Sequence, residues 1–265
     1  MAASKTESEA TKTPQADSAA AAPSLPLFYS GPQALSAERH GAKALASDAN
    51  YSFARETNSV PVTALELPRV MLNYPIVFTA AEPVAPVAIL GLRGARNLFV
   101  SDDGTWRAGA YIPAYVRRYP FILMESPDKQ QYTLCIDEAA PHVGDTGQAF
   151  FEDGEPTEVT KKALEFCATY QGQHVQTLEF TAMLDKYSLL VDNRAAITLA
   201  SGEKLSMSGF RVIDEEKFTA LPDDVFLDWR QRGWIALVYC HLLSLGNWQS
   251  MADGLASSEG LGNGS

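Results

Sequence analysis

The segment at residues 74–92, YPIVFTAAEPVAPVAILGL, decides how the first half of this chain folds. It holds two short apolar runs, at 74–78 and 87–92, which are separated by a stretch rich in proline and alanine. Apolar runs of this length, bounded by proline or glycine, are typical of β-strands, since helices need longer periodic segments. We therefore predict two strands here.

The sequence that follows continues the β-rich pattern. Asp103-Gly104 lies between residues 97–100 and 105–107, and an Asp-Gly pair between two β-favouring runs indicates a hairpin. Pro113 suits the start of a short helical turn, and Pro120 suits its end, because the residue before a proline avoids the helical conformation. Residues 121–124 and 132–136 predict a further pair of strands joined by a polar loop.

The pattern changes after residue 150. Thr157 suits a helix N-cap, and a face with three- or four-residue steps follows it. This face predicts an amphipathic helix at 157–187, with a break at Gly172 left open. Its members are Leu164, Cys167, Gln171, Val175, Leu178 and Ala182.

Residues 195–199 and 204–212 flank a Ser-Gly-Glu turn and predict a second hairpin. Helices are expected at 214–221 and 222–232, and a buried core element at 234–248, with Asn247-Trp248 capping it. Strands therefore gather first and helices later, without βαβ alternation. We predict an α+β fold in which an antiparallel, β-rich N-terminal half packs with a helical C-terminal half.

The ends of the chain differ from its middle. Residues 1–24 and 252–265 are small and polar, and we expect both to be disordered tails. Residues 25–251 then form a single domain, for which a subdivision near residue 150 stays open. The first 24 residues also lack the apolar run of a secretory signal, and the apolar 234–245 stretch is too short to span a bilayer.

The composition limits the classes of function. Among 265 residues, 21 are Lys or Arg and 32 are Asp or Glu, so the net charge is −11. This balance argues against binding to nucleic acid or to an anionic membrane surface. Cys135, Cys167 and Cys240 form no C-x-x-C motif, which argues against a disulfide framework or a zinc ribbon. We therefore expect a cytoplasmic protein without a cofactor.

One cluster of metal-ligating residue types follows a predicted strand. Asp137, Glu138, His142 and Asp145 could bind a divalent ion or act in acid–base chemistry. However, adjacent side chains on a strand point to opposite faces, so Asp137 and Glu138 would diverge. The interpretation we favour is a solvated loop after an apolar strand.

A second cluster combines arginines with aromatic residues. Arginine binds carboxylates and phosphates through a planar fork, and aromatic rings supply rigid contact area, so the cluster could anchor a partner or an anion. The interpretation we favour is that the aromatics fill the core while Arg117 and Arg118 pair with some of the 32 acidic residues. The candidate binding residues are Trp106, Arg107, Tyr111, Tyr115, Arg117 and Arg118.

Cys240 and His241 are neighbours in the apolar segment. Side chains one residue apart on a helix do not face each other, so a Cys–His dyad is not expected. We predict that His241 is a hydrogen-bonded histidine of the core.

Several blocks, in this order, resemble the SapC family of bacterial proteins. The resemblance extends over about residues 25–251. It is carried by Leu27-Phe28-Tyr29, Tyr74-Pro75-Ile76-Val77-Phe78, residues 112–121 (IPAYVRRYPF), Cys135-Ile136-Asp137-Glu138, Gly209-Phe210, residues 213–218 (IDEEKF) and His241-Leu242 with Ser244-Leu245 and Asn247.

The resemblance implies the pathway in which the protein works rather than a chemical mechanism. The family takes its name from a bacterial surface-layer locus, and its relatives are often encoded beside tryptophan-halogenase-like flavoproteins, cupin-like proteins and outer-membrane receptors. It brings no catalytic residues. We expect a non-catalytic accessory protein of a surface-layer or envelope-associated pathway, with a protein partner such as the flavoprotein or an envelope component.

Two alternatives stay open. The first is an enzyme or ligand-binding protein that modifies a peptide or small molecule beside the flavoprotein, with Asp137, Glu138 and His142 as its chemistry. The second is a subunit of the surface layer itself, against which the N-terminal sequence argues.

Overall fold

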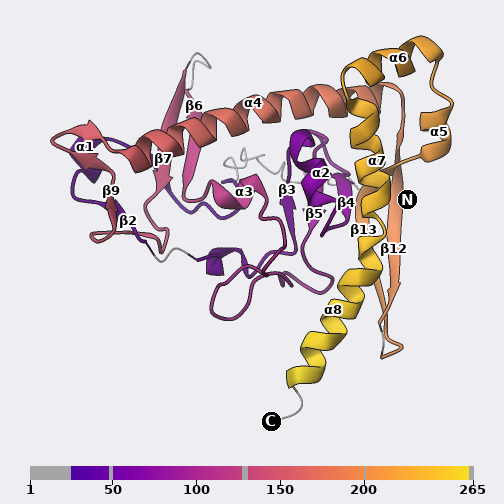
Figure 1. Ribbon diagram of the computed structural model, residues 1–265, viewed down its shortest axis with the longest axis horizontal. Coiled ribbons are helices and arrows are strands. Elements are labelled where there is room, and N and C mark those ends of the chain that lie inside the picture. The colour runs from indigo at the N-terminus through magenta and orange to yellow at the C-terminus, as the bar shows by residue number, and fades with distance from the viewer. Residues whose placement is uncertain (1–24, 48–49, 127–130, 200, 263–265) are drawn as a thin grey trace, which may run out of the picture.

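The computed structural model describes residues 25–47, 50–126, 131–199 and 201–262, with the side chains described as far as Leu255. Its architecture is α+β, as predicted, with antiparallel sheets built largely by the first half and helices mostly in the second (Figure 1). The expected tail at 1–24 lies outside the described residues. No helix within the described residues has the length and hydropathy to cross a membrane.

The largest sheet has five strands, and every neighbouring pair in it is antiparallel. Both the predicted strand pair after Tyr74 and the predicted hairpin near residue 200 are confirmed, and they belong to this one sheet. The strands, in spatial order, are β12 (Leu190–Thr198), β13 (Lys204–Ile213), β4 (Ile76–Thr79), β5 (Pro86–Ile89) and β3 (Ser59–Pro61).

A second, three-stranded sheet contains the other predicted pair, β6 (Phe121–Glu125) and β7 (Tyr132–Asp137), with β1 (Pro32–Ala34) on the far edge of β7. Short strands complete the end of the molecule nearest the start of α4. They are β2 (Ala44–Leu45) between β8 (Val143–Gly144) and β9 (Gln148–Ala149), and the pair β10 (Phe151–Glu152) and β11 (Glu155–Pro156).

The hairpin predicted around Asp103-Gly104 forms only as a turn. Ser101 N donates to Thr105 O at 3.0 Å, and a single bridge joins Val100 to Trp106. No strand extends from that bridge in this part of the described chain. The predicted turn at Asp103-Gly104 is therefore confirmed, but the residues on either side do not pair as β-strands.

Helix α4 (Glu158–Lys186) has 29 residues and runs unbroken through Gly172. In Figure 1 it crosses from the end with β2 and β9 to the end with α7. The predicted helix is confirmed but its predicted face is wrong, since Leu164 and Val175 are 47% and 50% exposed. Threonines share the true face with apolar residues, because their hydroxyls bond to the backbone, as Thr177 does to Gln173 O at 2.7 Å. The buried residues are Thr160, Cys167, Tyr170, Thr177, Phe180, Thr181 and Leu184.

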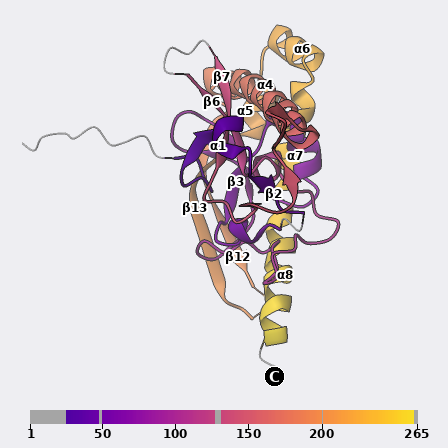
Figure 2. The ribbon, with the colours of Figure 1, turned by 90° about the vertical axis from the view of Figure 1, so that its left-hand side faces the viewer.

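The predicted C-terminal helices are confirmed as α5 (Glu215–Thr219), α6 (Asp223–Gln231) and α7 (Trp234–Ser244). Helix α8 (Asn247–Gly262) then begins where a cap was expected, and it continues beyond residue 252, where an unstructured tail was expected. Met251, Ala252 and Leu255 are buried, and this apolar contact is what extends the helix. In Figure 2, α8 and the β12–β13 hairpin extend together toward the same end.

The main core is continuous across the two halves of the sequence, joining residues 54–116 to residues 180–255. His241 is a hydrogen-bonded histidine of the core, as predicted, and it joins α7 to the large sheet. Its Nε2 accepts from Ile213 N at 3.0 Å and its Nδ1 donates to Ile76 O at 2.9 Å. Continued by two residues beyond Arg211 and Phe78, the register of β13 and β4 places Ile213 opposite Ile76. The imidazole therefore replaces a ladder bond where the strands separate.

Candidate functional site

The helical turn α3 (Ala114–Arg117) is fixed by the buried carboxylate of Glu66. Glu66 ends the short 3-10 helix η2 (Ala64–Glu66), next to α2 (Leu67–Val70). Its Oε1 accepts from Ala114 N at 2.6 Å and from the Tyr111 hydroxyl at 2.9 Å, while its Oε2 accepts from Thr63 N at 2.9 Å. The N-cap residue of α3 is Pro113, whose side chain makes no capping hydrogen bond. The Glu66 carboxylate therefore acts as the acceptor at the N-terminus of this turn.

Arg117 projects from the last position of α3 and is exposed. Its Nη2 donates to the Tyr111 hydroxyl at 3.1 Å and its Nε donates to Ile112 O at 3.0 Å. The guanidinium carbon lies 5.1 Å from the centroid of the Phe166 ring, which belongs to α4. Arg117 thus bridges α3 to α4 by a cation–π contact.

Two surface hollows, of about 260 and 230 Å³, lie on either side of this Arg117–Phe166 contact, and both residues line both hollows. We call these two hollows together the α3–α4 groove. The larger hollow is also lined by Leu65, Glu66, Arg69, Tyr111, Ala114, Thr169, Tyr170 and Gln173, and the smaller one by Leu45, Arg118, Tyr119, Phe121, Val159, Lys162, Ala163 and Cys167.

Arg118 lies among three tyrosine rings at the side of the groove. Its guanidinium carbon is 4.2 Å from the ring centroid of Tyr115, 4.6 Å from that of Tyr170 and 5.7 Å from that of Tyr29. Neither Arg117 nor Arg118 forms an ion pair with a carboxylate among the described residues. The expectation that both would pair with acids is therefore wrong, because ring faces occupy the positions that carboxylates would take.

The tyrosines around Arg118 stay neutral. Burial raises the pKa of Tyr29, Tyr115 and Tyr170, and the Arg118 charge lowers each pKa by less than burial raises it. Burial likewise raises the pKa of the Cys167 thiol to about 11. A thiol with such a pKa is protonated at neutral pH and is a poor nucleophile.

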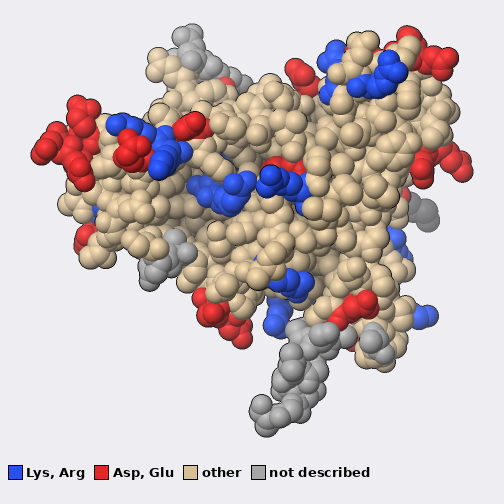
Figure 3. Space-filling model, viewed as in Figure 1, with Lys and Arg blue, Asp and Glu red and all other residues tan. Residues whose placement is uncertain are grey.

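The groove carries positive charge on a protein whose net charge is −11. Arg69, Arg117 and Lys162 are exposed, and none of them has a carboxylate within ion-pair distance in the described part of the chain. Glu66, the one acid among the lining residues that the structure describes, already accepts from donors at both carboxylate oxygens. Figure 3 shows blue atoms at the centre of this face, over α2 and α3, and red atoms mainly toward its edges. Anions are therefore favoured here.

Two residues of the predicted Arg–aromatic cluster lie elsewhere. Trp106 is buried, and its Nε1 donates to the Tyr74 hydroxyl at 3.2 Å. Arg107 donates to Leu98 O at 2.9 Å and lies 4.4 Å from the Phe99 ring centroid. Both line a separate hollow of about 340 Å³ that shares no residue with the groove. The structure thus brings together Tyr111, Arg117 and Arg118, while Tyr115 supports Arg118 from below the surface.

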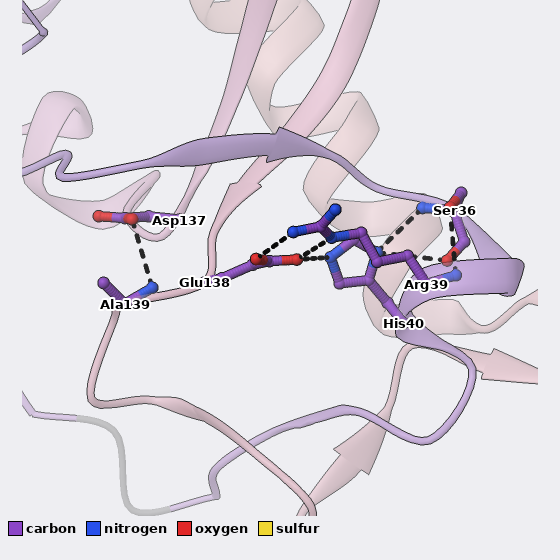
Figure 4. A network of polar contacts seen from close by, with 6 residues as sticks. All are labelled: Ser36, Arg39, His40, Asp137, Glu138 and Ala139. Carbon is purple, nitrogen blue, oxygen red and sulfur yellow. Dashed lines mark hydrogen bonds and ion pairs between the residues drawn. The ribbon is translucent and has the colours of Figure 1, made fainter.

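The proposed metal ligands are held apart. Asp137 is fully buried, and its carboxylate accepts from Ser30 N at 2.9 Å and Gly31 N at 3.1 Å. Glu138 points the other way, toward Arg39 and His40, as Figure 4 shows. The expected divergence of these neighbours is confirmed. The solvated-loop interpretation is wrong for Asp137, because this carboxylate ties down the chain before β1.

Glu138 is the acceptor of a surface network that includes α1 (Ala37–His40). It binds the Arg39 guanidinium through two hydrogen bonds, and His40 Nε2 lies 3.0 Å from its Oε1. The Arg39 hydrogen bond, with a smaller effect of His40, lowers the pKa of Glu138 to about 2. Farther along, the ring of His142 packs 5.7 Å from Phe53, and Asp145 pairs with Lys43 at 2.8 Å. Among the described residues, no three metal-ligating side chains gather at one point.

Sequence reasoning missed Glu66, Arg69, Lys162, Phe166 and Tyr170. One signal was available for Glu66, because Thr63-Ala-Leu-Glu66 has the spacing of a capping box. The other four reach the site only through tertiary contacts between α2, α3 and α4.

The comparison with protein families agrees with the resemblance found in the sequence. A protein-family model described as SapC matches residues 35–251, which is most of the chain. The chain therefore belongs to the SapC family. No curated protein and no solved structure matches it.

Proposed function

We propose that this SapC-family chain is a non-catalytic accessory protein that binds a protein partner through the α3–α4 groove, within a bacterial surface-layer or envelope-associated pathway. The observation that carries the proposal is the groove itself, in which Arg69, Arg117 and Lys162 have no carboxylate partner among the described residues while aromatic rings line the walls. Arginines and aromatic side chains are enriched at the centres of protein interfaces.

The ionisable groups nearby support binding rather than reaction. Glu66 has its acceptor positions filled, Cys167 is protonated, and Asp137 and Glu138 each hold a separate part of the backbone or surface. A general base needs a free position within reach of a substrate proton. The flavoprotein or an envelope component, which the family resemblance suggests, is the partner that we propose.

We place this activity in the cytoplasm as part of the proposal. Cys135, Cys167 and Cys240 are buried as free thiols, which suits a reducing compartment. Cell fractionation tests this part, and recovery of the chain in the surface-layer fraction would contradict it.

Affinity capture of the full chain from its native host tests the proposed interface. We would compare wild type with the double variant Arg69→Glu/Lys162→Glu, which reverses one exposed cation in each hollow. The matched control is Arg194→Glu/Lys204→Glu on the β12–β13 hairpin, where the same residue types are exposed. A stoichiometric partner, confirmed by reciprocal capture, should be lost from the groove variant and kept by the control. Equal recovery by both variants would refute the proposal.

One observation favours a second candidate, a protein that binds or modifies a small molecule. The larger hollow, of about 260 Å³, places the Tyr111 hydroxyl, Arg117 and Tyr170 around one space, and ligand sites combine such concavity with a few polar groups. Native mass spectrometry of the purified chain distinguishes the two functions. A stoichiometric small molecule that is absent from Arg69→Glu/Lys162→Glu would favour this candidate over the protein partner.

A further inference from the structure

The α3–α4 groove has the length of a short extended peptide. Along α4 its lining runs from Val159 to Gln173, which is about 21 Å at the rise of an α-helix. An extended chain covers that distance in about six or seven residues at roughly 3.3 Å each. A small free anion would fill one hollow, whereas a peptide could occupy both.

Positively charged side chains lie in both hollows of the groove. The larger hollow contains Arg69, the smaller contains Lys162, and Arg117 stands between them against the Phe166 ring. An occupant that satisfies all three cations must carry more than one negative group. The remaining lining mixes apolar side chains, among them Leu65, Val159 and Ala163, with polar ones such as Thr169 and Gln173.

We propose that the groove binds an extended acidic segment of the partner protein, about six residues long, with carboxylate side chains entering the two hollows and an apolar or aromatic side chain over Phe166. This inference rests on the proposed function, and it specifies the chemistry of the partner. Arginine and carboxylate match in a bidentate geometry, which favours Asp or Glu at the Arg69 and Arg117 positions. Since alternate side chains of an extended chain point to the same side, the carboxylates should lie at alternate positions.

The segment should bind with a marked dependence on salt. All three cations are at the surface, and exposed charge pairs are screened as ionic strength rises. Between about 50 and 500 mM salt we expect affinity to fall at least tenfold, because the Debye length shrinks from roughly 14 Å to about 4 Å.

An array of immobilised heptapeptides tests the inference on the full-length chain. The peptides carry Glu or Asp at none, one, two or three alternate positions, with Gln or Asn at the same positions in matched sequences, and with Phe, Leu or Ala between them. Binding is measured for wild type, for Arg69→Glu/Lys162→Glu and for Arg194→Glu/Lys204→Glu. Circular dichroism confirms that all three are folded.

We expect wild type and the Arg194→Glu/Lys204→Glu control to retain peptides with two or three carboxylates at least tenfold better than their amide counterparts. The groove variant should lose that preference. The inference is overturned if retained peptides are no richer in carboxylates than the rest, or if no retention depends on Arg69 and Lys162.

This outcome can be separated from failure of the proposed function. If capture from the host depends on the groove but the array shows no carboxylate preference, the accessory role stands and the acidic segment is wrong. If capture from the host is also the same for wild type and Arg69→Glu/Lys162→Glu, then both the proposed function and the acidic segment are wrong.

Discussion

The guanidinium carbon of Arg118 lies 4.2 Å from the centroid of the Tyr115 ring, and the rings of Tyr170 and Tyr29 close two further sides. The Nε of Arg118 is buried and has no hydrogen-bond partner among the described residues. Ring faces therefore replace part of the hydration of this half-buried cation. Guanidinium tolerates this better than ammonium does, because it is planar and more weakly hydrated.

The first prediction tests whether this site needs the planar guanidinium of Arg118 or only its positive charge. Arg118→Lys should lower the free energy of unfolding by about 1–2 kcal/mol, because the compact ammonium loses planar stacking and is harder to dehydrate. Arg118→Ala should lower it by about 2–4 kcal/mol through the added cavity. Urea unfolding measures both, and exposed Arg194→Ala serves as a control with an effect within about 0.5 kcal/mol. Wild-type stability in Arg118→Lys would show that charge alone suffices.

The second prediction concerns the carboxylate that fixes α3. Glu66→Ala should cost about 3 kcal/mol, because Ala114 N, Thr63 N and the Tyr111 hydroxyl lose their acceptor in a buried place. Glu66→Gln keeps one oxygen and should cost about 1–2 kcal/mol.

Urea unfolding measures these effects, with the exposed Glu165→Ala on α4 as the control. Equal stability of Glu66→Ala and Glu165→Ala would mean that water reaches the freed donors and that α3 is not held by this carboxylate.

The sequence predicted local structure well where the signal was local. The β4–β5 and β6–β7 pairs have apolar runs with proline or glycine beside them, and the β12–β13 hairpin has a Ser-Gly-Glu turn. The face of α4 was misplaced, because threonines such as Thr160 and Thr177 are buried by bonding to backbone carbonyls, which hydropathy does not record. The end of α8 was missed because Leu255 and its neighbours bury against distant residues.

The candidate site was predictable only in its densest block. Tyr111, Tyr115, Arg117 and Arg118 lie within eight residues, and their local pattern pointed to an interface. The partners that give the groove its shape come from elsewhere, since Glu66 is 48 residues from Ala114 and Phe166 reaches Arg117 only by the packing of α4. The same distance effect separates Trp106 and Arg107 from the block, because Trp106 donates to Tyr74 in another part of the core and the exposed Arg107 lies against the Phe99 ring.

The third prediction is a pH dependence caused by His241. Burial lowers the pKa of this imidazole from 6.5 to about 4, so the folded chain holds it neutral. Between those two values the unfolded chain binds a proton that the folded chain does not. The free energy of unfolding should therefore fall as pH decreases from about 6.5 toward 4, by a total of about 3 kcal/mol.

His241→Gln isolates this effect, because its amide can still donate to Ile76 O and accept from Ile213 N but does not titrate. Urea unfolding from pH 7.5 to 5 should give a curve for the variant that is flatter than that of wild type. The window also separates His241 from Glu138, whose pKa is lowered from 4.5 to about 2 and whose contribution is lost only at more acidic pH. Parallel curves for the two proteins would contradict the assignment.

The fourth prediction compares two glycines with positive φ. Gly147, between β8 and β9, has a φ of +126°, and a Cβ there would lie 2.1 Å from the carbonyl oxygen of Leu45 on β2. Gly154, between β10 and β11, has a φ of +83° and open space around the same position. Both substitutions by alanine incur backbone strain of about 1–2 kcal/mol, but only Gly147→Ala also drives a methyl group into the backbone.

We therefore expect Gly147→Ala to lower the free energy of unfolding by at least about 3 kcal/mol and Gly154→Ala by about 1–2 kcal/mol. Urea unfolding measures both. The difference reports how tightly β2 is enclosed by β8 and β9, and Leu45 of β2 lines the smaller hollow of the groove. If the two variants proved equally stable, the β8–β9 turn would have to move away from Leu45 at little cost, and this end of the molecule would be a poor support for the smaller hollow of the groove.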